Sequence, residues 1–382
     1  MKTIKYILFL SFLVGLFYME ASRMFIVETS ITSSIIYPLT VLFCSFLLIK
    51  IGNSTKDRNY KSVLILVVWL YLLSVLHSVF SPFTATYNYV SLILPAFCLY
   101  LPQNILSNEF SKKLFDWGNI VVFIFLLSFY FSNYNNNIFI EVDNQNNAAY
   151  TVLFYAPILL CINNKLIRYI VLFITGFALF YSLKRSGIAA FVLGLVAFFY
   201  VTLKISDKKN KKFAYVLLCC LCLFGVGEIT QDLLGDRIEL LTNRFSTMED
   251  IGSGRGDIYQ ATWKMIEKCD IFDLFVGHGY EGVAQDSPFA CSAHNDYLEF
   301  MYDYGIIGLI LLLSFVKKFG QTVINLLRNK SQFAAPAAFT FVVVIINSFF
   351  SHVFYYEWYF LLVAIFWGYL IWNVRQETIL KT

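Results

Sequence analysis

The chain has 382 residues, of which 58% are hydrophobic and only 14% are charged, and its mean hydropathy is +0.66. Soluble domains usually carry roughly 25% charged residues, so this composition excludes an ordinary water-soluble protein and predicts an integral membrane protein. The net charge of +4 is small and no nucleic-acid-binding motif is present, so nucleic acid is not expected as a partner.

Twelve apolar segments recur along the chain, each about long enough for an α-helix to cross a ~30 Å hydrocarbon core. The first follows Lys2 and Lys5 as in a signal peptide, but no A-x-A cleavage site follows it, so we expect it to be retained. Residues 1–382 are therefore predicted to form a single all-α membrane domain, a bundle of about twelve transmembrane helices. The expected spans are 4–20, 33–51, 62–80, 87–103, 114–132, 147–163, 169–184, 186–205, 213–229, 297–316, 332–351 and 356–373.

Lysine and arginine are distributed unequally between the two sides of these spans. If both termini are cytoplasmic, all but eight of the 29 basic residues fall in cytoplasmic loops, which is the side that retains positive charge. We therefore expect both termini to be cytoplasmic, with the basic loops lying against anionic membrane lipid. The eight outward residues are Arg23, Lys184, Arg185, Arg237, Arg244, Arg255, Lys264 and Lys268.

One outward loop, residues 230–293, is much longer than the others, and loops of this length are usually functional. Residues three or four apart in it form an apolar stripe, which predicts a helix over about 257–268 that lies across the outer mouth of the bundle and is capped by Asp257. Two cysteines, Cys269 and Cys291, lie outside the spans, so the sequence allows a disulfide between them. The stripe consists of Ile258, Thr262, Met265 and Cys269.

Three outward cations are candidates for binding an anion. Lys184 and Arg185 occupy a tight turn between two spans, where they either extend to lipid phosphates or hold a bound anion, and a guanidinium suits phosphate. Arg255, in GSGRGD, directly precedes the predicted helix, whose free N–H groups also favour an anion; the alternative is a solvated arginine in a turn. The glycine pattern around it matches neither a dinucleotide fingerprint nor a P-loop.

His294, in AHNDYLEF, is the candidate proton acceptor. We expect it in the first turn of the span near 297–316, where the helix dipole disfavours the imidazolium and leaves a neutral ring. The alternative is a polar residue at the membrane interface. Asn295 and Asp296 are placed to cap this helix or to orient the ring.

Three acidic residues and three other histidines are further candidates. Asp296, Glu299 and Asp303 share one helical face, but no metal-ligand spacing accompanies them, so no metal is expected. For the remaining histidines a structural role is the simpler interpretation; they are His77, His278 and His352.

These segments together resemble the O-antigen polymerase and O-antigen ligase superfamily of bacterial membrane glycosyltransferases. The resemblance spans roughly residues 180–312 and is carried by SLKRSGIAAF, GRGDIYQATWKMI, FVGHGY and AHNDYLEFMYDYGIIGL, with DNQNNAAY before the sixth span. It implies a GT-C-like fold with short helices in the long periplasmic loop. It also implies inverting transfer of a glycan from undecaprenyl pyrophosphate to a sugar hydroxyl, without metal or cofactor, at the periplasmic face of the bacterial inner membrane.

The resemblance also implies roles for single residues. By position, His294 matches the base of the family, and Arg185 and Arg255 match its pyrophosphate-binding arginines. Lys184 stands where relatives often have a small or polar residue, so the two adjacent cations share that assignment. The residues expected to contact substrate are Lys184, Arg244, Asn295, Asp296 and His278.

Three activities fit these residues. A polymerase would transfer the growing chain to another carrier-linked repeat unit, whereas a ligase would transfer the finished chain to lipid A core. We favour the polymerase, with a chain-length-regulating membrane protein as an expected partner. A flippase or exporter of lipid-linked oligosaccharide would need cations along a central cavity and alternating-access symmetry, which the sequence does not indicate.

Overall fold

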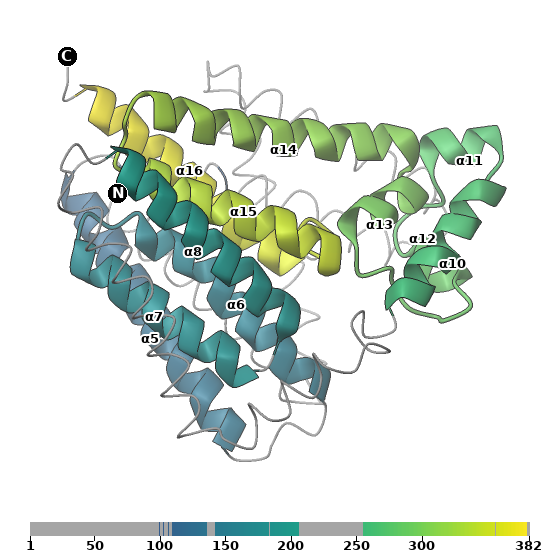
Figure 1. Ribbon diagram of the computed structural model, residues 1–382, viewed down its shortest axis with the longest axis horizontal. Coiled ribbons are helices and arrows are strands. Elements are labelled where there is room, and N and C mark those ends of the chain that lie inside the picture. The colour runs from purple at the N-terminus through teal and green to yellow at the C-terminus, as the bar shows by residue number, and fades with distance from the viewer. Residues whose placement is uncertain are drawn as a thin grey trace.

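The computed structural model describes residues 109–135, 142–182, 184–205, 255–355 and 357–379, together with residues 99, 102 and 106. Every regular element within these segments is an α-helix, as the sequence predicts (Figure 1). They are α5 (Glu109–Asn135), α6 (Val142–Leu160), α7 (Lys165–Ser182), α8 (Arg185–Ile205), α10 (Arg255–Lys268), α11 (Ile271–Val276), α12 (Gly282–Asp286), α13 (Asp296–Asp303), α14 (Gly305–Arg328), α15 (Ala334–Phe350) and α16 (Glu357–Ile379).

Six of the predicted spans each fall on one long helix: α5, α6, α7, α8, α15 and α16. By length and composition α7, α8 and α14 are able to cross a membrane, and apolar helices also cover Ala149–Leu160 and Ala334–Phe350. The predicted spans 4–20, 33–51, 62–80, 87–103 and 213–229 lie wholly or almost wholly outside the described residues.

The predicted span 297–316 is wrong, because the chain breaks between α13 and α14. Gly305 has a φ of 65°, and a Cβ there would lie 2.4 Å from the carbonyl carbon of Phe275. A side chain would therefore clash with backbone at the junction, which only glycine permits. Helix α14 begins at Gly305 and continues to Arg328. Lys317 and Lys318, which were expected in a loop, therefore lie within this helix.

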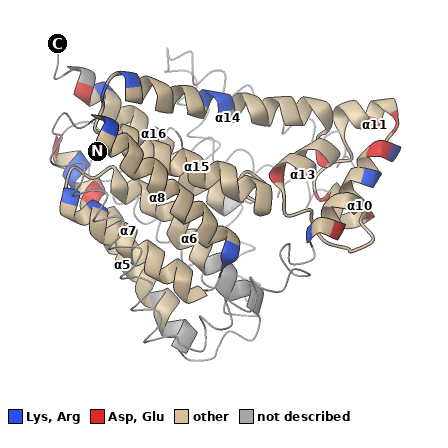
Figure 2. Ribbon diagram, in the orientation of Figure 1, with Lys and Arg blue, Asp and Glu red and all other residues tan. Residues whose placement is uncertain are grey.

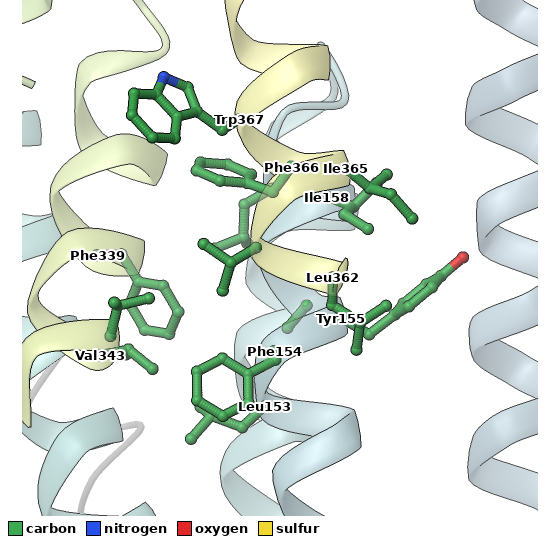
Figure 3. Packing of buried hydrophobic residues seen from close by; sticks show 14 of the residues in the cluster. Leu153, Phe154, Tyr155, Ile158, Phe339, Val343, Leu362, Ile365, Phe366 and Trp367 are labelled. Carbon is green, nitrogen blue, oxygen red and sulfur yellow. The ribbon is translucent and has the colours of Figure 1, made fainter. Parts of the chain in front are cut away.

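The core of the bundle lies where α6, α15 and α16 meet (Figure 3). Helices α6 and α16 are apolar on nearly all sides, which is typical of helices inside a bundle. Tyr155 on α6 donates a 2.6 Å hydrogen bond to the Asn119 side chain, so the buried hydroxyl also joins α6 to α5. The interlocking side chains include Leu153, Phe154 and Ile158 of α6, Phe339 and Val343 of α15, and Leu362, Ile365 and Phe366 of α16.

Charge is concentrated at the ends of the bundle. Figure 2 shows basic residues where α5 and α7 begin and where α8, α14 and α16 end, and also in the middle of α14, which contains Lys317 and Lys318. Apart from these two lysines, the described basic residues that were expected on the cytoplasmic side share one end of the bundle. At the opposite end α7 ends, α8 begins and α15 ends; we call this the site end.

Beside the site end, α10, α11, α12 and α13 form a small appended cluster next to the start of α14 (Figure 1). Ile266, Val283, Ala293 and Tyr302 form its buried core, with Met265 and Cys269 packed against it. The helix predicted over 257–268 is confirmed, but it begins at Arg255, so Asp257 lies within the first turn and not at the cap. Cys269 and Cys291 are both free thiols.

Gly194 sets how closely α8 approaches α15. A Cβ at this position would lie 2.8 Å from Val343 Cγ2 and 3.0 Å from Phe339 Cδ2, so a larger residue must push the two helices apart. We expect Gly194→Leu to reduce the free energy of unfolding by about 1–3 kcal/mol, the usual cost of overpacking a core. Thermal unfolding of the detergent-solubilised protein measures this.

The matched control is Gly256→Leu, because a Cβ at Gly256 meets no atom within 4 Å. An unfolding midpoint that falls equally in both variants would contradict the role of close α8–α15 packing.

Candidate active site

His294 precedes α13 and does not lie in its first turn, contrary to the sequence expectation. Helix α13 begins at Asp296, and Asn295 is its N-cap, with the side-chain oxygen accepting from the N–H groups of Tyr297 and Leu298 at 3.0 and 3.2 Å. The capping role expected of Asn295 is thus confirmed. His294 itself has a φ of 52°, in the left-handed region, which turns the chain sharply before the helix.

The His294 ring is neutral, but the main cause is burial. Its pKa is lowered to about 3, first by burial and then by the nearby His352, Arg255 and Lys184. Since burial penalises the charged imidazolium, the ring is neutral at physiological pH, with one nitrogen protonated and the other not. A neutral imidazole in this position has a nitrogen lone pair available to accept one.

Arg255 is brought to His294 because α10 is fastened to the end of α15. The Arg255 guanidinium donates to the backbone carbonyl of Phe350. One turn further along α10, the Tyr259 hydroxyl lies 2.8 Å from the carbonyl oxygen of Phe349 and 3.3 Å from that of His294. Three segments distant in sequence therefore meet at Tyr259, and Arg255 lies at the edge of this junction.

Lys184 approaches from the turn between α7 and α8. Its Nζ lies 5.1 Å from the centre of the Tyr150 ring, and the Tyr150 hydroxyl is 2.5 Å from Ser186 Oγ. This arrangement positions the ammonium group near His294, whose pKa it lowers. Arg185 is the first residue of α8 and is half-buried beside it. Lys184, one of the two cations in this turn, thus acts on the histidine through its charge.

Asp296 has a different role from the capping or ring-orienting roles that the sequence suggested. Its side chain is completely buried, and its two carboxylate oxygens accept from the backbone N–H groups of Val353, Phe354 and Tyr355 at 2.8, 3.0 and 3.2 Å. These residues form the loop between α15 and α16. One carboxylate thus connects that loop to the segment that carries His294.

Glu299 and Asp303 share the buried face of α13 with Asp296, as their spacing predicted. Glu299 accepts from the Ala293 N–H at 2.9 Å, and Asp303 accepts from the Val283 N–H at 3.0 Å and from the Tyr355 hydroxyl at 2.5 Å. Burial raises the pKa of Asp303 to about 7 and that of Glu299 well above its usual range. Among the described residues, no group of three or more His, Cys, Asp or Glu side chains is arranged to hold a metal ion.

Two of the predicted substrate-binding residues remain, His278 and Arg244. His278 stacks on the Tyr302 ring, with 4.1 Å between ring centroids, and its Nε2 is 3.6 Å from Asp273. It packs within the appended cluster, as the simpler structural interpretation had it. Arg244 lies outside the described residues.

His352 is a residue that the sequence analysis assigned only a structural role. Its ring lies beside that of His294, with 5.2 Å between centroids and 34° between planes. Its position in SHVFYYEWYF, at the same predicted side of the membrane as His294, was the signal in the sequence. Only the folded chain shows that these two histidines, 58 residues apart, are neighbours.

Comparison with known families identifies the class of protein. Residues 170–313 match the family model described as O-antigen ligase, a segment that includes Lys184, Arg185, Arg255 and His294. The match confirms the resemblance to the O-antigen ligase and polymerase superfamily over this segment, and members of that family are membrane glycosyltransferase-like enzymes. Comparison with curated proteins finds no match.

Replacing Asp296 by Asn tests the connection between the two loops. An amide oxygen accepts fewer hydrogen bonds than a carboxylate, and its NH2 group would face backbone donors. We expect hydrogen exchange at the amides of Val353, Phe354 and Tyr355 to become about 10–100-fold faster, the equivalent of losing about 1.5–3 kcal/mol. Mass spectrometry of exchanged peptides measures this.

Asp257→Asn, which removes an exposed carboxylate from α10, is the control and should leave exchange in the loop unchanged. Unaltered protection of the loop in Asp296→Asn would show that the three hydrogen bonds do not hold it.

Proposed function

We propose that this chain is an O-antigen or related surface-polysaccharide polymerase. In this proposal it transfers a growing glycan from undecaprenyl pyrophosphate to a sugar hydroxyl of another carrier-linked repeat unit, at the periplasmic face of the bacterial inner membrane. The observation that supports this most directly is the convergence of Lys184, Arg255 and a neutral His294 at one end of an apolar bundle.

The cations Lys184 and Arg255 suit a pyrophosphate leaving group. As the bond between the sugar and the pyrophosphate breaks, negative charge develops on the phosphate oxygen, and positioned cations stabilise that charge strongly in a site with little water. Lys184 comes from the α7–α8 turn and Arg255 from α10, and both lower the pKa of His294, so both cations are available to a diphosphate bound beside that histidine. Arg185 extends the same basic turn.

The neutral His294 suits the role of base for the acceptor hydroxyl. A sugar hydroxyl must lose its proton as its oxygen attacks the anomeric carbon, and an imidazole within hydrogen-bond reach can take that proton. Because burial keeps His294 unprotonated, it is in the correct state before the reaction begins. Attack from the face opposite the pyrophosphate would invert the anomeric centre.

The apolar surface of the bundle suits the polyprenyl tail of the carrier. Exposed aliphatic side chains on α8 and α14, such as Val196 and Ile310, suit contact with acyl chains, and the site lies at the end of these helices. A polyprenyl tail could therefore stay in the bilayer while its pyrophosphate reaches the cations. Membrane lipid and carrier-linked oligosaccharide are the partners we propose, with a chain-length-regulating membrane protein as a further one.

A ligase that transfers the glycan to lipid A core is the second candidate, because the matched family model carries the ligase description. Both reactions use the same donor chemistry and differ in the acceptor. Purified protein incubated with a synthetic carrier-linked repeat unit separates them: a ladder of products on a gel indicates a polymerase, whereas product formed only after addition of lipid A core indicates a ligase. A protein that moves the substrate across vesicles without forming either product would be an exporter.

His294→Ala should reduce the rate of transfer in this assay by about 10²–10⁴-fold, the usual contribution of a positioned general base. His294→Gln should be similarly inactive, because an amide is not basic. Elution of both variants as monodisperse protein in the same detergent controls for folding. Transfer at the native rate by either variant would remove His294 from the role of base.

Arg255→Ala and Lys184→Ala should each weaken binding of the pyrophosphate carrier by about 10–100-fold, since a hydrogen bond to a charged group contributes about 1.5–3 kcal/mol. Measuring Arg185→Ala beside them shows which cation of the α7–α8 turn contacts the diphosphate. Binding of the carrier to protein in nanodiscs provides the measurement.

Lys264→Ala is the matched control for this series, because Lys264 is an exposed cation on the same helix as Arg255. Carrier affinity unchanged in all three test variants, or reduced equally by Lys264→Ala, would contradict a specific diphosphate site.

A further inference from the structure

His352 lies in the loop after α15 and is held there on several sides. Its Nε2 is 3.0 Å from Ser292 Oγ and 3.7 Å from Glu299 Oε1, and its Nδ1 is 3.7 Å from Asp296 Oδ1. The side chain is only 12% exposed. The ring therefore has one nitrogen bonded to a hydroxyl and the other facing a carboxylate just beyond hydrogen-bond distance.

The distance between the two histidines is fixed by backbone. Asp296, two residues after His294, accepts from the three amides that follow His352 directly. Tyr259 adds a second connection, since its hydroxyl contacts the carbonyls of both His294 and Phe349. Because these hydrogen bonds hold the two loops together, they also fix the 5.2 Å distance between the ring centroids of His294 and His352.

The charges around the two rings differ in sign. Lys184, from the α7–α8 turn, and Arg255, from α10, act on His294, with the Tyr150 ring of α6 beneath Lys184. Asp296 and Glu299 of α13 and the Tyr355 ring flank His352. A positive charge is therefore less favourable on His294 than on His352.

The proposed reaction makes this difference important. With its pKa lowered to about 3, His294 is a poor place for a proton to remain after the sugar hydroxyl has released it. Burial and the neighbouring Asp303 raise the pKa of Glu299. One carboxylate oxygen of Asp296 lies 3.7 Å from His352 Nδ1, and the carboxylate accepts three backbone N–H hydrogen bonds.

We propose that His352 is a positioning residue that acts through His294 and takes over its proton during glycosyl transfer. This rests on the proposed function. The acceptor oxygen forms its bond to the anomeric carbon, the bond from that carbon to the pyrophosphate oxygen breaks, and the electron pair leaves with the pyrophosphate. The hydroxyl proton moves to His294 and then, directly or through one water, to His352, where the imidazolium lies beside Asp296.

The test is the steady-state kinetics of His352→Gln with the synthetic carrier-linked repeat unit. Glutamine can still bond Ser292 but cannot be protonated. We expect kcat to fall by about 10²-fold with KM for the carrier-linked substrate unchanged, because the residue acts on proton transfer and not on binding.

Ser292→Ala is the second variant, since it removes one hydroxyl near the surface of the loop and leaves the histidine in place. It should lower kcat by about 5-fold, the value of one neutral hydrogen bond, again with KM unchanged. Native kcat in His352→Gln would overturn the proposal, as would a rise in KM that accounts for the whole loss. If the wild-type protein itself makes no product, it is the proposed function that fails.

Discussion

The site depends on one buried carboxylate. Asp296 accepts from three consecutive backbone amides of the α15–α16 loop, and it follows the segment that turns at His294. A buried anion with this many donors is strongly favoured over one left unpaired, so the two loops cannot separate without exposing it to an apolar interior. The contact between His294 and His352, and with it the geometry of the site end, follows from this single interaction. Tyr259 then brings α10 and Arg255 to the same place.

A division of charge follows from that geometry. Cations from the α7–α8 turn and from α10 act on His294, whereas Asp296 and Glu299 of α13 lie beside His352. For a reaction that releases a pyrophosphate and a proton, such a division separates the two products as they form: the anion meets Lys184 and Arg255, and the proton moves towards the carboxylates. The same acids have hydrogen-bond partners in the loops and so help to hold the site together.

Sequence and structure agree where local periodicity decides the outcome. Long apolar runs become helices because a chain in an apolar surrounding must satisfy its backbone hydrogen bonds internally, and the stripe after Arg255 forms α10 for the usual amphipathic reason. The prediction fails at Tyr304 and Gly305, where apolar residues continue across a break. There the cause is a close approach of the Phe275 backbone, which hydropathy does not record. Asp257, which was expected at the cap, lies in the first turn of α10, because that helix begins at Arg255.

The sequence by itself determined the class of protein, the all-helical character, and the identities of Lys184, Arg185, Arg255 and His294 as candidate residues, since composition, charge and motif are properties of short segments. The tertiary structure decided which of these meet. Contacts between residues far apart in the chain place His352 beside His294 and place His278 against Tyr302. It also decided why His294 is neutral: burial and neighbouring cations lower its pKa, and both arise only when separate helices pack together.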